Sequence, residues 1–333
     1  MPSPLPSRSA LSFFSLSICA LLLAGCFGEA ARPVEITPEP PPPVMVPQLP
    51  KIGLALGGGA ARGFAHVGVI KMLESQGIKP DLVVGTSAGS VVGALYAAGH
   101  GGFELQEMTF DLDRAAFADW QFFGRGLLRG EALQKFINEH VGGRPIEQLP
   151  MRFGAVSTRL RTGEGVLFQR GDVGLAVRAS SAIPGVFVSP MIGGEEYVDG
   201  GTTAPVPVEY ARQMGAEVII AVDISQPVAE APSDSTLRTV LKTFDIMGNA
   251  LKVNELKLAD VVISPNVKGI AATDFESKQR AILEGERAAL AAIPKIKEAI
   301  AAKTRLVPAV APESGLPPVP TAPIVMPPPS TAR

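Results

Sequence analysis

Leu82-Val83-Val84-Gly85-Thr86-Ser87-Ala88-Gly89 is the stretch of this 333-residue chain that decides its fold. Three apolar residues precede a Gly-x-Ser-x-Gly turn, and an apolar run from Ser90 to Ala98 follows it and stops at Gly99. This pattern is typical of a strand, a sharp turn and a helix with a glycine stop. Glycines two residues before and after Ser87 remove Cβ atoms that would clash in such a turn. We therefore expect Ser87 to be exposed at the turn as a candidate nucleophile.

A second unit of the same kind precedes this one along the chain. Lys51 to Leu56 is a short apolar run, a glycine-rich loop follows it, and Phe64 to Leu73 has the apolar spacing of a helix. Two later apolar runs, 218–222 and 261–263, have the pattern of buried strands, and the segment 282–303 has the pattern of a helix. Continuous apolar runs of this kind occur in parallel strands that are covered on both faces. The sequence therefore predicts an α/β fold with helices on both faces of the sheet.

Composition excludes several classes of function. The formal net charge is -2, and no basic run with interleaved aromatic residues occurs, so we do not expect nucleic-acid binding. The only two cysteines, Cys19 and Cys26, lie near the N-terminus. The predicted folded domain therefore has no disulfide, no cysteine nucleophile and no thiolate metal cluster.

The N-terminal segment has the features of a secretion signal. Arg8 precedes an apolar stretch from Leu11 to Leu23, which is shorter than the roughly 20 residues of a membrane-spanning helix. Small residues directly before Cys26 resemble the lipobox of bacterial lipoproteins, which predicts a signal peptide over 1–25 and a lipid anchor on Cys26. An ordinary signal peptide or a membrane anchor with an incidental cysteine is the alternative. By resemblance to bacterial sorting rules, Phe27 predicts the outer membrane, facing the periplasm.

Proline-rich segments flank the predicted domain. Residues 33–50 read PVEITPEPPPPVMVPQLP, which is typical of an extended polyproline spacer. A second such segment starts at about Leu306. We therefore expect a tether over 26–50, a folded domain over 51–305 and a tail over 306–333 that does not pack.

The loop Gly57-Gly58-Gly59-Ala60-Ala61-Arg62-Gly63 is open to several interpretations. A Walker A loop requires Lys and Ser/Thr after its second glycine, and here Phe64 and Ala65 follow. A dinucleotide site requires a third glycine where Arg62 stands. Free backbone amides beside a serine turn are what an oxyanion hole requires, and a simple tight turn is the remaining alternative.

The base that would activate Ser87 is not an obvious histidine. In α/β-hydrolases the histidine comes last in chain order, but no histidine follows His140. His66 lies on an apolar stretch, where a core role is the simpler interpretation, and His100 and His140 are expected at the surface. Asp199, which ends a short strand before two glycines, is the strongest acidic candidate. A carboxylate can accept the serine proton if burial raises its pKa toward the working pH.

These residues resemble the patatin-like phospholipases, in particular the bacterial branch similar to the catalytic domain of neuropathy target esterase. The resemblance covers roughly residues 51–302 and includes the flanking segments 63–69 and 179–187. It implies a three-layer α/β/α sandwich with a mostly parallel central sheet, and an acyl hydrolase acting on membrane phospholipid or lysophospholipid. The implied reaction requires no metal and no organic cofactor.

Carried over residue by residue, the resemblance implies a Ser-Asp dyad of Ser87 and Asp199. It also implies an oxyanion hole formed by the amides of three loop residues: Gly58, Gly59 and Ala60. Ala60 departs from the family's usual glycine, so the hole would be disturbed if the backbone there requires positive φ. Arg62 matches a basic residue of the loop and would pair with a lipid phosphate or support the loop.

Two further questions are open from sequence alone. An aromatic-rich stretch between about Phe103 and Leu128 would form an acyl groove or lid, or be ordinary core. The chain would be an active acyl hydrolase, or a lipid-binding lipoprotein that keeps the fold without useful turnover. A nucleotide-binding protein is the third alternative.

Overall fold

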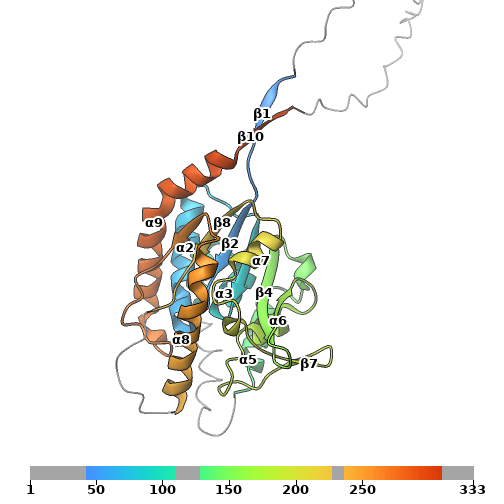
Figure 1. The fold of residues 1–333 in the computed structure, drawn as a ribbon, viewed down its shortest axis with the longest axis vertical. Helices are drawn as coiled ribbons and strands as arrows, with labels where there is room; N and C mark the ends of the chain where they lie inside the picture. Colours follow the sequence, from blue (N-terminus) through green and yellow to red (C-terminus); the bar gives the residue numbers. More distant parts are fainter. Residues whose placement is uncertain (1–42, 110–127, 227–235, 310–333) are drawn as a thin grey trace, which may run out of the picture. The chain divides into compact units, whose positions relative to one another are not determined.

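The structure is a computed structural model that describes residues 43–109, 128–226 and 236–309. Met45–Pro308 form one compact unit of the chain (Figure 1). Its centre is an eight-stranded sheet with the order β6-β7-β4-β3-β2-β8-β9, in which β5 pairs with β4. The strands of this sheet are β2 (Ile52–Leu56), β3 (Leu82–Thr86), β4 (Arg152–Arg159), β5 (Gly165–Phe168), β6 (Met191–Ile192), β7 (Glu195–Asp199), β8 (Val218–Val222) and β9 (Val261–Ile263).

Five consecutive strands of the sheet, β4-β3-β2-β8-β9, are all parallel, and β5, β6 and β7 add an antiparallel side. Every residue of β2, β3 and β8 is buried. Strands of this kind need apolar side chains on both faces, which explains the continuous apolar runs in the sequence. The predicted α/β fold with a mostly parallel sheet is confirmed.

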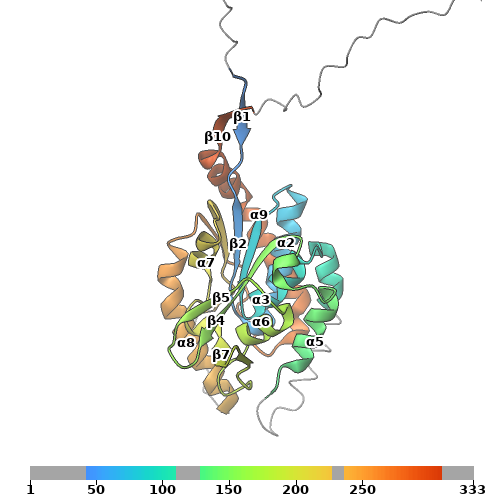
Figure 2. The same cartoon turned by 90° about the vertical axis from the view of Figure 1, so that its right-hand side faces the viewer.

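Helices cover both faces of the sheet (Figure 2). Leu54 and Leu56 of β2 belong to a large apolar cluster with α2, α3 and α9, whereas Ala55 between them belongs to a second cluster with α7. The alternation follows from the two-residue period of a strand. The helices are α2 (Phe64–Ser75), α3 (Ala88–Ala97), α5 (Glu131–His140), α6 (Val173–Ser180), α7 (Val208–Gln213), α8 (Thr236–Leu256) and α9 (Lys278–Lys303).

The proline-rich flanks of the predicted domain are partly structured. Met45–Gln48 form strand β1, which pairs antiparallel with β10 (Arg305–Pro308) in a separate two-stranded sheet. The compact unit therefore reaches a few residues beyond the predicted limits of 51 and 305 at each end. Within the described residues, no helix combines the length and apolar character needed to span a membrane.

The topology places a crevice at one edge of the sheet. From β2 the chain proceeds through β3 to β4 on one side, and it later returns to add β8 and β9 on the other side of β2. Ligands of open α/β sheets bind beyond the carboxyl ends of the strands at such a switch point. The glycine loop follows β2 and Ser87 follows β3, so both lie at this edge.

Candidate active site

Ser87 occupies the predicted sharp turn between β3 and α3. Its backbone angles are φ 53° and ψ -123°, a conformation that non-glycine residues rarely adopt. A Cβ on Gly85 would lie 2.2 Å from the carbonyl oxygen of Gly89, and a Cβ on Gly89 would lie 2.1 Å from that of Leu56. Gly85 is therefore required for the turn itself, and Gly89 is required for the turn to pack against the end of β2. The strained conformation is what a nucleophile elbow imposes on its serine.

Two neighbouring serines hold the turn in place. The Ser87 N–H donates to Ser180 Oγ at 2.9 Å, and Ser180 Oγ in turn donates to the carbonyl of Val156 on β4. Ser90 Oγ donates to the Ser87 carbonyl at 2.7 Å. Both supporting serines are fully buried, so the backbone of Ser87 is fixed from both sides. Ser87 itself is only 8% exposed, contrary to the expectation of an exposed serine, because its side chain lines a cavity rather than the outer surface.

The glycine loop offers two amides rather than three. The Gly58 N–H donates to the Pro205 carbonyl at 2.9 Å, so this amide is occupied, contrary to the expectation that it would form part of an oxyanion hole. Among the described residues, the amides of Gly59 and Ala60 have no hydrogen-bond acceptor. Both residues line the same cavity as Ser87. An oxyanion hole at this loop would therefore use Gly59 and Ala60.

Ala60 has the positive φ that would disturb the oxyanion hole at a residue other than glycine. Its φ is 49°, and among the described non-glycine residues only Ser87 shares a positive φ. A left-handed conformation costs an L-residue about 1–2 kcal/mol relative to ordinary backbone. Ala60 therefore keeps its amide beside the cavity, but its backbone is strained.

Replacing Ala60 by glycine is expected to increase the free energy of unfolding by up to about 1 kcal/mol, because relief of the strain exceeds the chain entropy that glycine adds to the unfolded state. Ala61 is the matched control, since it is buried and has no positive φ. Ala61→Gly is expected to lower the same free energy by about 1 kcal/mol. Urea unfolding of both variants measures the difference, and an equal loss of stability in both would contradict the assignment of strain to Ala60.

Asp199 ends β7 and is buried, with 1% of its surface exposed. Its Oδ1 accepts the Gly201 N–H at 2.7 Å, and its own N–H donates to the Ala182 carbonyl at 2.9 Å. Within the described residues, Oδ2 has no partner at ordinary hydrogen-bond geometry. Burial raises the pKa of Asp199 from 3.8 to about 7, while the Gly201 N–H and the adjacent Ser87 hydroxyl lower it less. The carboxyl group therefore has the pKa expected of a general base near neutral pH.

Arg62 supports the loop rather than pointing free into the cavity. Its Nε donates to the Gly59 carbonyl at 3.0 Å, and a terminal nitrogen pairs with Asp245 of α8 at 2.7 Å. The side chain is 5% exposed. Of the two roles expected for Arg62, these contacts favour support of the loop.

The three histidines are not positioned as bases. His66 is fully buried, and its Nε2 donates to the Gly57 carbonyl at 2.8 Å, which ties α2 to the glycine loop. Burial lowers the pKa of His66 to about 4, so the ring is neutral. His100 and His140, expected at the surface, are half-buried and contact each other, and neither lines a cavity that contains Ser87. Cys26 and residues 110–127 of the aromatic stretch lie outside the described residues.

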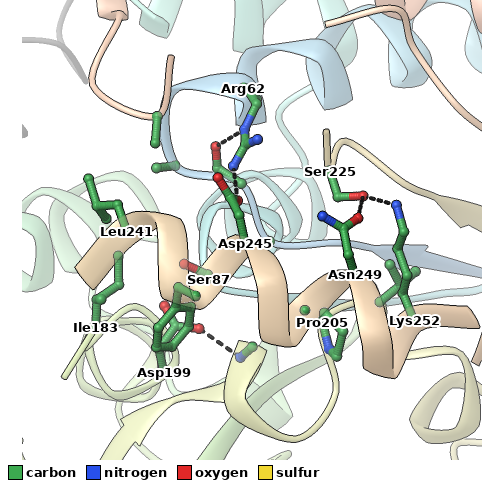
Figure 3. Close-up of a pocket in the computed structure, with 18 of the residues that line it drawn as sticks. Arg62, Ser87, Ile183, Asp199, Pro205, Ser225, Leu241, Asp245, Asn249 and Lys252 are labelled. Atoms are coloured by element: carbon green, nitrogen blue, oxygen red, sulfur yellow. Dashed lines mark hydrogen bonds and ion pairs between the residues drawn. The ribbon is translucent and has the colours of Figure 1, made fainter. Parts of the chain in front are cut away.

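Two cavities of different character meet at Ser87 and share Ala60 and Ile183. The first, which we call the polar cavity, has a volume of about 630 Å³, is partly open to solvent and lies beside α8. Besides Asp199, it is lined by these polar residues: Arg62, Asp223, Ser225, Asp245, Asn249 and Lys252. Figure 3 shows α8 crossing it, with Ser87 and Asp199 toward one end and Ser225 and Lys252 toward the other. The second, which we call the apolar cavity, has a volume of about 680 Å³ and is lined mainly by apolar residues: Phe64, Val91, Val92, Leu133, Phe187 and Phe275.

The chain is similar to proteins of a known family. The family model of the patatin-like phospholipases matches residues 54–212. Residues 54–212 are a patatin-like phospholipase domain. An uncharacterized NTE family protein of Mycobacterium tuberculosis is 37% identical over 192 residues, which are 56% of this chain and 52% of that protein. Patatin-like phospholipase domain-containing protein 6 of Mus musculus is 32% identical over 182 residues, which are 52% of this chain and 13% of that protein.

The chain thus spans about half the length of the NTE family relative. The crystal structure of VipD from Legionella pneumophila has a TM-score of 0.48 and 14% identity, covering 78% of this chain and 68% of that chain. The matched residues include every site residue predicted from the sequence for the hydrolase reaction, from the glycine loop to Asp199. Helix α8, which lines the polar cavity, lies after the matched residues.

Some residues of the site were not predicted from the sequence. Asp223 directly follows the predicted strand at 218–222, and its position at a carboxyl end was a signal that could have found it. The apolar spacing of 236–256 could have predicted α8. Nothing in the sequence indicated that Asn249 and Lys252 of this helix share a cavity with Ser87 of the patatin-like domain.

Proposed function

We propose that this protein is a serine hydrolase that cleaves carboxylic esters of membrane lipids, as a phospholipase, lysophospholipase or carboxylesterase. Membership of the patatin-like phospholipase family implies lipid acyl hydrolase activity. The observation that carries the finer proposal is the arrangement around Ser87. A strained serine lies beside a buried aspartate whose pKa is about 7, and the same cavity is lined by two loop amides that have no acceptor in the described part of the chain.

In the proposed mechanism, Ser87 Oγ attacks the ester carbonyl while its proton passes to the carboxylate of Asp199. The Gly59 and Ala60 amides stabilise the negative charge that develops on the carbonyl oxygen. Collapse of the tetrahedral intermediate breaks the bond to the alcohol, which leaves with the proton from Asp199, and an acyl-enzyme remains. Asp199 then takes a proton from water, the resulting hydroxide attacks the acyl-enzyme, and the fatty acid is released as Ser87 regains its proton.

The apolar cavity is suited to bind the acyl chain of the substrate. It begins at Ser87 and continues between Phe64, Val91 and Phe275. Burial of a methylene group contributes about 0.8 kcal/mol, so a long acyl chain there would supply much of the substrate's binding energy.

An activity-based probe distinguishes this proposal from an inert lipid-binding lipoprotein. The purified protein is expected to react with a fluorophosphonate, and mass spectrometry is expected to locate the adduct on Ser87. The same protein should release fatty acid from lysophospholipid vesicles or micelles. Absence of both labelling and fatty-acid release would reject the hydrolase and favour the inert lipoprotein.

We also propose that Cys26 carries a lipid anchor that holds the domain on the periplasmic face of a bacterial outer membrane. The small residues before Cys26, the apolar stretch before them and Phe27 after it support this proposal. Cys26→Ser is expected to move the protein from the outer-membrane fraction to the soluble fraction, because the variant lacks the acceptor thiol. Fractionation with immunoblotting measures this. An unchanged distribution, or a soluble wild type, would reject the anchor.

A further inference from the structure

The polar cavity contains a connected set of side chains that the proposed mechanism does not use. Asp223 follows β8, and its Oδ2 pairs with Lys252 Nζ at 3.0 Å while its Oδ1 accepts the Ser225 N–H at 2.9 Å. Lys252 Nζ also donates to Ser225 Oγ. Asn249, one turn earlier in α8, donates through Nδ2 to the Gln226 carbonyl at 2.7 Å. These side chains link the carboxyl end of β8 to α8.

Lys252 and Asn249 have hydrogen-bond donors that the set does not use. The Asp223 carboxylate accepts one bond on each oxygen and pairs with Lys252, while an ammonium group has three donors and an amide nitrogen has two. The described residues accept two bonds from Lys252 and one from Asn249, so each has a donor left. The Lys252 side chain is 18% exposed and lines the cavity. A ligand rich in acceptors, such as a phosphate group, complements these donors.

The position of Lys252 limits which substrates can reach it. Phe244 of α8 lies close to Gly201, next to Asp199, whereas Lys252 comes eight residues later in the same helix. Eight residues of an α-helix span about 12 Å. Ser87 and Lys252 therefore lie toward opposite ends of one cavity (Figure 3). A substrate must extend well beyond its ester bond to contact Lys252.

We propose that Lys252 and Asn249, with Asp223 and Ser225 holding Lys252 in place, form a subsite for a phosphate-bearing headgroup on the alcohol side of the substrate. The inference rests on the proposed acyl hydrolase function and assigns the polar cavity within it. The acyl chain then occupies the apolar cavity, and the leaving alcohol extends through the polar cavity along α8. The subsite makes the enzyme selective for phospholipid esters over neutral glycerides.

Two substrates that share an acyl chain test this selectivity: 1-palmitoyl lysophosphatidylethanolamine and 1-palmitoylglycerol, which lacks the phosphate. In Lys252→Gln, the ratio of their kcat/KM values is expected to fall at least about tenfold, the loss of one charged hydrogen bond. Lys252→Arg should recover most of the ratio. Lys257→Gln is the control, because Lys257 is exposed just beyond the end of α8 and should leave the ratio unchanged.

An unchanged ratio in Lys252→Gln would overturn the subsite, and so would an equal loss on both substrates, which would mean that Lys252 only supports the fold. If Lys252→Gln does not fold, Asn249→Asp tests the same idea, because a carboxylate there should repel the phosphate and lower the ratio.

Binding of sn-glycero-3-phosphoethanolamine, measured by calorimetry, separates the subsite from catalysis. The wild type is expected to bind this product analogue at least about tenfold more tightly than Lys252→Gln. If the wild type hydrolyses neither substrate, the proposed function fails and this measurement alone decides the subsite. Equal binding by both proteins, or none by the wild type, would overturn it.

Discussion

Ser87→Ala is expected to lower kcat for ester hydrolysis by at least about 10⁴-fold, because the variant lacks the oxygen that forms the acyl-enzyme. Binding is expected to persist, since the backbone amides of Gly59 and Ala60 and both cavities remain. The fold should be retained, because alanine keeps the Ser180 and Ser90 contacts, which involve only the backbone of residue 87. The measurement is fatty-acid release under single-turnover conditions, together with fluorophosphonate labelling.

Ser75→Ala is the matched control for this experiment. Ser75 ends α2, is exposed, and its hydroxyl donates to the Met72 carbonyl within its own helix. The control should retain wild-type turnover and labelling. If Ser87→Ala kept more than about a hundredth of the wild-type kcat, a covalent mechanism through Ser87 would be untenable.

Four of the five parallel strands, β2, β3, β8 and β9, were predictable because each is short, apolar and has glycine or a charged residue beside it. Strand β4 was not predicted, because Gly154 and polar residues interrupt its apolar run. The runs at 218–222 and 261–263 coincide with β8 and β9, and the helix predicted from Ile282 begins four residues earlier. The pairing of β1 with β10 was not predictable. It joins segments more than 250 residues apart in the chain, and their proline content favours an extended chain whether or not it finds a partner.

The site was predictable where local chemistry determines it. The Gly-x-Ser-x-Gly turn requires a strand before it and a helix after it, so Ser87 could be placed from its neighbours alone. The state of each loop amide was not predictable. The Gly58 N–H is not free to bind an oxyanion, because it donates to the carbonyl of Pro205, which is far away in the sequence. The polar cavity was not predictable for the same reason, because it forms where α8 lies next to the carboxyl end of β8, and these segments are separate in the sequence.

Asp199→Asn is expected to lower kcat by about 10³–10⁴-fold while leaving the site's shape intact, because an amide cannot accept the Ser87 proton. In the wild type, kcat/KM should rise with pH below 7 and level off above it, since only the carboxylate form is a base and the pKa of Asp199 is about 7. The residual activity of the variant should lack this dependence. A wild-type profile that is flat between pH 5 and 8 would contradict the assignment of Asp199 as the base.

The same pKa makes a prediction about stability that is independent of turnover. The pKa of Asp199 is about 7 when folded and near 3.8 when unfolded, so between these values the folded protein binds more protons than the unfolded one. The contribution of Asp199 to stability is therefore full below about pH 4 and falls as pH rises to about 7. Asp199→Asn carries no such charge. Its free energy of unfolding, relative to the wild type, should increase by a few kcal/mol over this range. A difference that does not change with pH would mean that the Asp199 carboxyl group is not buried as a charge, and it would remove the physical basis for its role as a base near neutral pH.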